Sequence, residues 1–234
     1  MRYRALACDY DGTLAHDGRV HRNVVMALER CRASGRKLLI VTGRELGDLQ
    51  AIFGRLDVFD YIIAENGGVL HCPPTGEERL LGTSPPDVFI QALRTRGVDP
   101  LAVGRVILAT RSPFETVVLE TIRDLGLELH VVFNKGSVMV LPSGVNKATG
   151  LAEALARLEI PPQNAVAVGD AENDHALLDA AGLGVAVASA VPMLLERADF
   201  VTRGGEGLGV IELIDRLLEN DLAEINPRKR SAPG

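Results

Sequence analysis

The sequence contains no tryptophan, and aromatic residues make up only 4% of its 234 residues. Proteins that hold single-stranded nucleic acid stack its bases on aromatic side chains, so this composition disfavours such a platform. Positive charge is also in short supply, because 25 lysine and arginine residues face 31 acidic ones, for a formal net charge of −6. Without a basic excess the protein is poorly suited to neutralise a phosphate backbone, and we expect no nucleic-acid partner.

Cysteine and long hydrophobic runs are scarce as well. The three cysteines are an odd number without metal-site spacing, which argues against a disulfide framework and against a zinc ribbon. A reducing compartment suits them, so we expect a cytoplasmic protein. The longest apolar run, residues 183–195, is interrupted by glycine, serine and proline and is shorter than the roughly 18 residues of a membrane-spanning helix. We therefore expect no membrane segment.

The chain does contain an alternation of short apolar runs and helical patterns, which is typical of a parallel sheet with helices on both faces. Runs that are apolar at every position fit strands that are covered on both sides. We therefore predict an α/β protein with a doubly wound, Rossmann-like parallel core. Its predicted strands are residues 5–8, 37–41, 59–64, 165–168, 183–187 and 200–201.

The middle of the chain has a different pattern, and prolines separate it from its surroundings. We call residues 84–143 the insert and expect a small α+β domain with two helices, one strand and a hairpin whose turn lies near Asn134. The core then consists of residues 1–83 and 144–225. We expect the basic segment that follows, residues 226–234, to be a flexible tail.

Four aspartates follow the ends of two predicted strands. Asp9 and Asp11 come after the first strand, while Asp170 and Asp174 follow the strand at 165–168. The carboxyl ends of parallel strands meet at one edge of a sheet, and several like charges there need compensation. A hard cation such as Mg²⁺ supplies it. A single aspartate could equally cap a helix or form a turn, but two aspartate-rich loops favour a metal site.

Other residues at strand and helix ends suit an anion. Lys147 begins a predicted helix, where a cation opposes the helix dipole unless it faces an anion. Thr42 and Gly43 end the second predicted strand and offer a hydroxyl and free N–H groups. The alternatives are a solvated lysine and a helix cap. Arg44 could bind a substrate anion or pair with a surface acid.

In this order, residues 9–14, 42–44, 147 and 169–174 resemble the four motifs of the haloacid dehalogenase-like hydrolase superfamily. The position of the insert resembles the subgroup with a large α+β cap, which includes phosphoglycolate, sucrose-phosphate and trehalose-phosphate phosphatases and phosphomannomutases. Residues 65–68, Glu-Asn-Gly-Gly, resemble small archaeal phosphoglycolate phosphatases and related sugar phosphatases.

The resemblance implies a role for each matching residue. Asp9 would be the nucleophile that forms an aspartyl-phosphate, and Asp11 would be the general acid and base. The residues implied to bind phosphate are Thr42, Gly43, Lys147 and Asn173. Mg²⁺ would be held by Asp9, the backbone carbonyl of Asp11, Asp170 and, through water, Asp174. Weaker candidates for contact with the substrate are Arg44, Asn66, Asn134 and Lys135.

The expected function is therefore the Mg²⁺-dependent hydrolysis of a small phosphorylated metabolite, of the phosphoglycolate or sugar-phosphate type. A sugar phosphomutase has the same motifs, and a trehalose-phosphate or sucrose-phosphate phosphatase is a further alternative. A regulatory module phosphorylated on aspartate is the non-enzymatic alternative. The pattern identifies neither the leaving group nor the oligomeric state.

Overall fold

The core is built on one eight-stranded sheet. The computed structural model describes residues 1–227, so all but the first two residues of the predicted tail, 226–234, lie outside the described residues. In their order across the sheet the strands are β12 (Phe200–Val201), β11 (Leu183–Ala186), β10 (Ala165–Gly169), β1 (Ala5–Asp9), β2 (Lys37–Val41), β3 (Tyr61–Ala64), β4 (Val69–Cys72) and β5 (Glu77–Leu80).

The strands from β12 to β3 pair in parallel, which confirms the predicted doubly wound core. The sheet is not parallel throughout, because β4 and β5 form an antiparallel hairpin at its edge. This hairpin was not expected from the sequence pattern. All four residues of β5 are exposed, so the strand has no apolar alternation by which it could be recognised.

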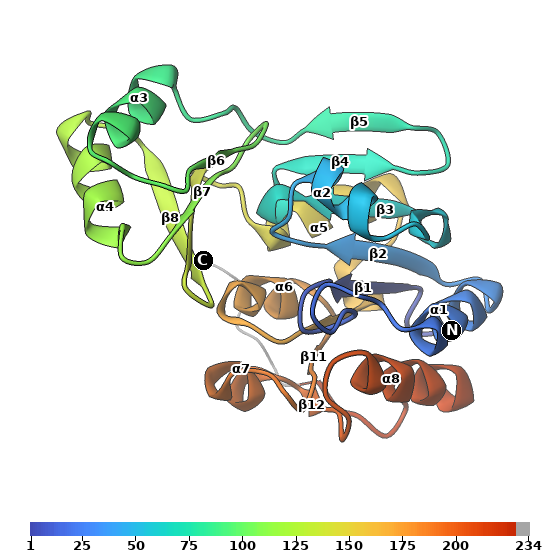
Figure 1. Cartoon of the computed structure of the whole chain (residues 1–234). Helices are drawn as coiled ribbons and strands as arrows, with labels where there is room; N and C mark the ends of the chain where they lie inside the picture. The colour runs from blue at the N-terminus through green and yellow to red at the C-terminus, as the bar shows by residue number, and fades with distance from the viewer. Residues whose placement is uncertain (228–234) are drawn as a thin grey trace.

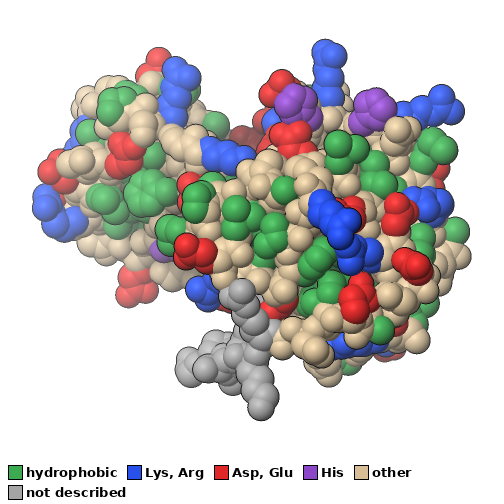
Figure 2. Space-filling model, turned by 90° about the horizontal axis from the view of Figure 1, so that it is seen from below, with side chains coloured by type: hydrophobic (Ala, Val, Ile, Leu, Met, Phe, Trp, Pro, Cys, Tyr) green, Lys and Arg blue, Asp and Glu red, His purple; other side chains and the backbone are tan. Residues whose placement is uncertain are grey.

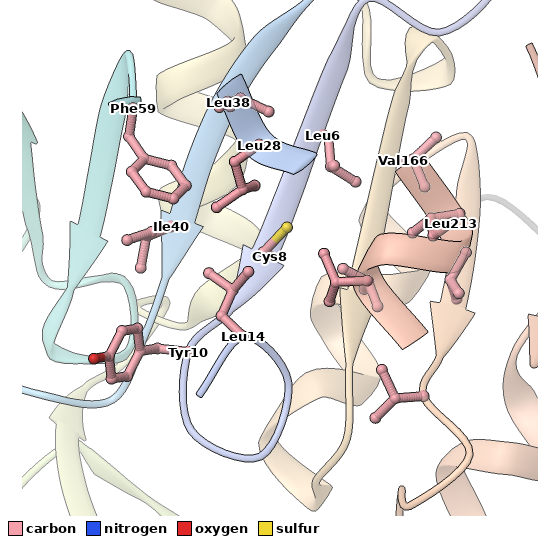
Figure 3. Close-up of a cluster of buried hydrophobic side chains, with 14 of the residues drawn as sticks. Leu6, Cys8, Tyr10, Leu14, Leu28, Leu38, Ile40, Phe59, Val166 and Leu213 are labelled. Carbon is pink, nitrogen blue, oxygen red and sulfur yellow. The ribbon is translucent and has the colours of Figure 1, made fainter. Parts of the chain in front are cut away.

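Alternating residues of the strands pack into two layers. Leu6 and Cys8 of β1 join one hydrophobic cluster, while Ala5 and Ala7 join the other. The helices α1 (Arg22–Ala33) and α8 (Glu206–Asn220) lie side by side over the first layer, where Leu28 and Leu213 reach the sheet (Figure 3). The helices α5 (Lys147–Arg157) and α6 (His175–Ala180) cover the second.

Two further helices, α2 (Leu46–Ile52) and α7 (Pro192–Arg197), were not anticipated from the sequence. The remaining helical turns of the core are short 3-10 segments, η1 (Leu56–Val58), η2 (Glu65–Gly67), η3 (Pro162–Asn164) and η4 (Glu172–Asp174). Within residues 1–227, every helix is too short or too polar to cross a membrane.

The insert forms a second lobe beside the core (Figure 1). Its four-stranded sheet has the order β6 (Ala102–Val103), β7 (Leu108–Arg111), β9 (Ser137–Pro142), β8 (Leu129–Asn134), and all pairs are antiparallel. The helices α3 (Asp87–Thr95) and α4 (Glu115–Asp124) pack on one face through Phe89, Leu93 and Val118. The other face carries Met139 and Leu141, which join the core cluster. The insert thus turns its open sheet face toward the core.

The missing side chain of Gly150 lets α5 pack closely against the sheet. A Cβ added to Gly150 of α5 would stand 2.4 Å from the Ile63 side chain and 2.9 Å from the Cα of Gly67. We expect Gly150→Ala to lower the free energy of unfolding by about 1–3 kcal/mol in urea denaturation, because the helix must move away. Gly47→Ala in α2 is the matched control, since nothing lies within 4 Å of its added Cβ. This control should raise the free energy of unfolding by about 0.4–1 kcal/mol. Equal changes in the free energy of unfolding of both variants would contradict the close packing of Gly150.

Candidate active site

The first predicted loop begins with a buried carboxylate. Asp9 is the last residue of β1, a central strand of the sheet, and only 4% of its surface is exposed. The chain then turns tightly, with the carbonyl of Tyr10 accepting hydrogen bonds from the backbone N–H groups of Leu14 and Ala15. Gly12 has a φ of +83°, the left-handed region that glycine adopts without strain. The turn leaves Asp9 facing the residues at the other strand ends.

A lysine at the start of α5 neutralises this carboxylate. Lys147, the first residue of α5, is 1% exposed, and its Nζ donates to Oδ1 of Asp9 at 2.6 Å and to Oδ1 of Asp174 at 2.7 Å. Burial raises the pKa of Asp9 well above its usual value, and the nearby Asp174 raises it further against the effect of Lys147. Burial alone lowers the pKa of Lys147, but the two carboxylates together raise it above its usual value.

Three of the predicted acidic residues lie together. Oxygen atoms of Asp9, Asp170 and Asp174 are all within 4.8 Å of one another, and all three residues are buried. Hard carboxylate oxygens are the ligands that Mg²⁺ prefers. A Cβ on Gly12 would stand 2.3 Å from Oδ2 of Asp170, so the absence of a side chain at residue 12 keeps space beside this carboxylate. In this structure the ammonium of Lys135 lies at that point, 2.8 Å from the added Cβ. The three carboxylates are a donor set that fits a divalent cation.

The carboxylate of Asp174 fixes the backbone of the loop that follows β10. Oδ2 of Asp174 accepts hydrogen bonds from the backbone N–H groups of Asp170 and Ala171, both at 3.0 Å. Thr13, which is fully buried, donates from Oγ1 to Oδ1 of Asp170 at 3.1 Å. Sequence reasoning gave Thr13 no role, although it lies inside the first motif. It joins the two aspartate-rich loops.

The loop after β2 lies next to this cluster. Thr42 is fully buried, and its Oγ1 accepts a hydrogen bond from the backbone N–H of Arg44 at 3.1 Å. A Cβ added to Gly43 would stand 3.9 Å from Nδ2 of Asn173 and 3.3 Å from Sδ of Met139. The predicted phosphate-binding residues Thr42, Gly43 and Asn173 are therefore neighbours, and the insert reaches them through Met139.

Two other predicted residues pair with partners inside the site. The guanidinium of Arg44 binds the carboxylate of Asp11 in bidentate fashion, with Nε at 2.6 Å and Nη2 at 2.7 Å. This hydrogen bonding raises the pKa of Arg44 above its usual value. The carboxylate of Asp11 thus points to Arg44 and is not part of the acidic cluster. Asn66 is buried, and its Oδ1 accepts a hydrogen bond from Nδ2 of Asn173 at 3.1 Å.

The hairpin of the insert reaches into the same site. The turn between β8 and β9 carries Lys135, whose Nζ lies 2.5 Å from Oδ2 of Asp170. The preceding Asn134 has a buried Oδ1 without a hydrogen-bond partner. Seen from below, the molecule is hollowed between the insert and the core, and charged side chains lie at the rim of this hollow (Figure 2). The site therefore lies between the two lobes and is closed on one side by the hairpin.

Most of this chain also matches known proteins. The model of the haloacid dehalogenase-like hydrolase family matches residues 6–83 and 105–214. A phosphoglycolate phosphatase of Methanothermobacter thermautotrophicus is 34% identical over 226 residues, which cover 92% of this chain and 99% of that protein. The phosphoglycolate phosphatase of Haloarcula marismortui is 34% identical over 219 residues, which cover 89% of this chain and 95% of that protein.

Solved structures have the same fold at lower sequence identity. A haloacid dehalogenase-like hydrolase from Bacteroides thetaiotaomicron has a TM-score of 0.79 at 20% identity, covering 92% of this chain and 99% of that one. A sugar phosphatase of subclass IIB of the same superfamily has a TM-score of 0.76 at 21% identity, covering 92% of this chain and 98% of that one.

The buried ion pairs predict how stability depends on pH when the lysine is removed. Lys147→Met leaves Asp9 and Asp174 uncompensated, so at pH 7 we expect the free energy of unfolding to fall by about 3–5 kcal/mol. A carboxyl group whose pKa is raised by folding takes up a proton as the chain folds. The deficit should therefore shrink as the pH is lowered from 7 to 5, as measured by urea denaturation.

The control for this prediction is Lys37→Met. Lys37 pairs with Asp60 at 2.9 Å, but 45% of its side chain is exposed. The ammonium of this pair reaches water although the Asp60 side chain is only 13% exposed, so we expect a loss of about 1 kcal/mol or less that changes little with pH. A deficit of Lys147→Met that stays constant from pH 7 to 5 would contradict the electrostatic explanation.

Proposed function

The chain belongs to the haloacid dehalogenase-like hydrolases, and we propose that this phosphatase hydrolyses a small phosphorylated metabolite through an aspartyl-phosphate on Asp9, with Mg²⁺ bound beside it. The observation that carries the proposal is the buried contact of Asp9 and Asp174 with Lys147, at 2.6 and 2.7 Å, next to Asp170. A buried nucleophile, an adjacent cation and carboxylate ligands meet the needs of phosphoryl transfer, which depends chiefly on positioning and charge neutralisation.

In the first step a carboxylate oxygen of Asp9 attacks the phosphorus atom, and the bond from phosphorus to the ester oxygen breaks. The leaving oxygen takes a proton from the protonated carboxyl group of Asp11. In the second step the oxygen of a water molecule bonds to the phosphorus atom, the water proton passes to Asp11, and the bond from phosphorus to Asp9 breaks. The Asp11 carboxylate is now held by Arg44 at 2.6 and 2.7 Å. To donate to the leaving oxygen, Asp11 must separate from Arg44 and take up a proton, so Arg44 holds the carboxylate in place between turnovers.

The residues proposed to bind the transferring phosphoryl group come from two loops and from the start of α5. They are the hydroxyl of Thr42, the N–H of Gly43, the ammonium of Lys147 and the amide of Asn173. Mg²⁺ would be held by Asp9, the backbone carbonyl of Asp11 and Asp170, with Asp174 in support. When bound, it neutralises charge on the phosphoryl oxygens.

In this proposal the hairpin between β8 and β9 faces the leaving group of the substrate. Lys135 is half exposed and contacts Asp170, so it brings a cation of the insert to the acidic cluster. We propose an acidic leaving group of the phosphoglycolate type, in which the carboxylate meets Lys135. The proteins from M. thermautotrophicus and H. marismortui, both named phosphoglycolate phosphatases, support this choice.

The principal test is release of inorganic phosphate. With Mg²⁺ present, we expect phosphate release from phosphoglycolate, and Asp9→Asn should lower kcat by at least about a thousandfold because an amide does not form the phosphoenzyme. Asp215→Asn is the control, because Asp215 is an exposed residue of α8 that pairs with Arg30 away from the site. Chelation of divalent cations should abolish the activity, and added Mg²⁺ should restore it.

Other outcomes of the same assay would favour another function. A rearranged phosphoester without free phosphate would indicate a phosphomutase. A stable phosphoenzyme that turns over no ester would indicate a regulatory module. Full activity of Asp9→Asn would refute the assignment of the nucleophile.

The proposed role of Lys135 predicts a change in substrate preference. Lys135→Met should raise KM for phosphoglycolate about tenfold or more, the effect of losing a charge-assisted hydrogen bond. For p-nitrophenyl phosphate, whose leaving group carries no carboxylate, KM should change less than about threefold, since that bond is not made. Steady-state kinetics of both esters measures the difference, with Lys37→Met as the control. Equal losses for both esters would contradict recognition of the leaving group by Lys135.

A further inference from the structure

Three consecutive residues of the segment η2 have left-handed backbone angles. The φ angles are +51° for Glu65, +53° for Asn66 and +107° for Gly67. Residues with a side chain adopt this region at a conformational cost, so two of them in succession must be held by their surroundings. Glu65 is also 1% exposed, and no step of the proposed reaction uses its carboxylate.

Two of the three residues join loops of the site to one another. The N–H of Asn66 donates to the carbonyl of Thr42 at 2.8 Å, and its side chain accepts from Asn173. A Cβ on Gly67 would stand 2.0 Å from the carbonyl oxygen of Asn146, the residue before Lys147. The segment therefore fixes the second, third and fourth motifs relative to one another.

The carboxylate of Glu65 faces the insert instead. Its Oε2 accepts hydrogen bonds from the N–H groups of Val106 at 2.7 Å and Ile107 at 3.0 Å, while Oε1 accepts from the N–H of Arg105 at 3.1 Å. Successive backbone N–H groups form a concave anion site, and such charge-assisted bonds are stronger than neutral ones. We call this set of three bonds the Glu65 clamp. It attaches the core to the turn between β6 and β7.

The turn held by the clamp lies where the chain enters and leaves the insert. A Cβ on Gly82, in the segment that enters, would stand 3.0 Å from the Val106 side chain and 2.9 Å from Pro142 and Val145, which belong to the segment that leaves. Val106 also contacts the core, because a Cβ on Gly68 would stand 2.7 Å from it. The clamp thus lies at the position about which the insert would pivot.

The opposite end of the insert's sheet carries Lys135, which contacts Asp170. From the clamped turn, β7 runs to Arg111, which pairs with Ser137 of β9, and Ser137 in turn pairs with Asn134 of β8. The next residue is Lys135, with Nζ at 2.5 Å from Asp170. A paired sheet is rigid, so the orientation set at one end determines where the hairpin lies at the other.

We propose that Glu65 is a positioning residue: its clamp fixes the pivot of the insert and thereby places Lys135 over the active site. The same three-residue segment binds Thr42 and Asn173, so the pivot and the phosphate-binding loops share one support. The kinetic part of this inference rests on the proposed function, whereas the structural part does not depend on any activity.

The structural part is tested by amide hydrogen exchange in Glu65→Gln. A glutamine side chain of the same size lacks one acceptor oxygen and the charge, so the amides of 105–107 should exchange about tenfold faster or more. The amides of 134–136, at the distant hairpin, should also exchange faster. Glu78→Gln is the matched control, because Glu78 binds the side chain of Arg105 and leaves the backbone N–H groups untouched. Its exchange at 105–107 and 134–136 should equal that of the unmodified protein.

The kinetic part is tested by a double-mutant cycle. Glu65→Gln should raise KM for phosphoglycolate about tenfold, as Lys135→Met does, with a change of less than about threefold for p-nitrophenyl phosphate. The double variant should be no worse than Lys135→Met alone, because a misplaced hairpin has already lost its ammonium contact. A purely structural role of Glu65 would lower the activity toward both esters and would add to the effect of Lys135→Met.

A second variant perturbs the clamp without changing Glu65. A Cβ on Gly104 would stand 2.7 Å from Oε2 of Glu65, so Gly104→Ala should displace the turn and reproduce both results. It replaces Glu65→Gln if that variant does not fold. Unchanged exchange at 105–107 would overturn the clamp, and faster exchange there without a change at 134–136 would overturn its link to the hairpin. Failure of every ester to turn over would refute the proposed function and leave the exchange test of the clamp intact.

Discussion

The contact of Lys147 with two buried carboxylates is the constraint on which the rest of the site depends. Asp9 and Asp174 lie 2.6 and 2.7 Å from its ammonium and are almost unexposed. Removing such charges from water is costly unless they are paired with good geometry. The strand β1, the helix α5 and the loop after β10 must therefore meet at one point, although 138 positions of the chain separate Asp9 from Lys147.

Small residues make this meeting possible. Gly150 lets α5 approach β3, Gly67 lets the start of α5 approach the segment η2, and Gly169 leaves room for the Asp174 side chain, which a Cβ there would meet at 2.5 Å. At each of these positions an added Cβ would collide with a neighbouring segment or with Asp174. The acidic overall composition is compatible with phosphate binding because a lysine and free N–H groups supply positive charge locally.

The sequence predicted the features that depend on local patterns. Apolar runs located the central strands, and the residues after them identified Asp9, Asp170 and Asp174 as candidates, because parallel strand ends share one edge. The hairpin of β4 and β5 escaped prediction, because its outer strand is exposed on both faces. The partners of Asp11 and Glu65 were not predicted from the sequence either. The Asp11–Arg44 pair and the Glu65 clamp join residues that are 33 to 42 positions apart. Such contacts are decided by tertiary structure, which local pattern does not encode.

Charge also explains why the insert should contribute a cation. Asp9, Asp11, Asp170 and Asp174 carry a formal charge of −4, and Lys147, Arg44 and Lys135 carry +3, which leaves −4 + 3 = −1. With a divalent cation bound, the sum becomes +1, a site that attracts a phosphate dianion. Without Lys135, the formal charge of the site with the divalent cation bound is zero. With a divalent cation bound, the insert therefore supplies the charge that makes the site cationic. The proposed positioning role of Glu65 would then extend to substrate binding.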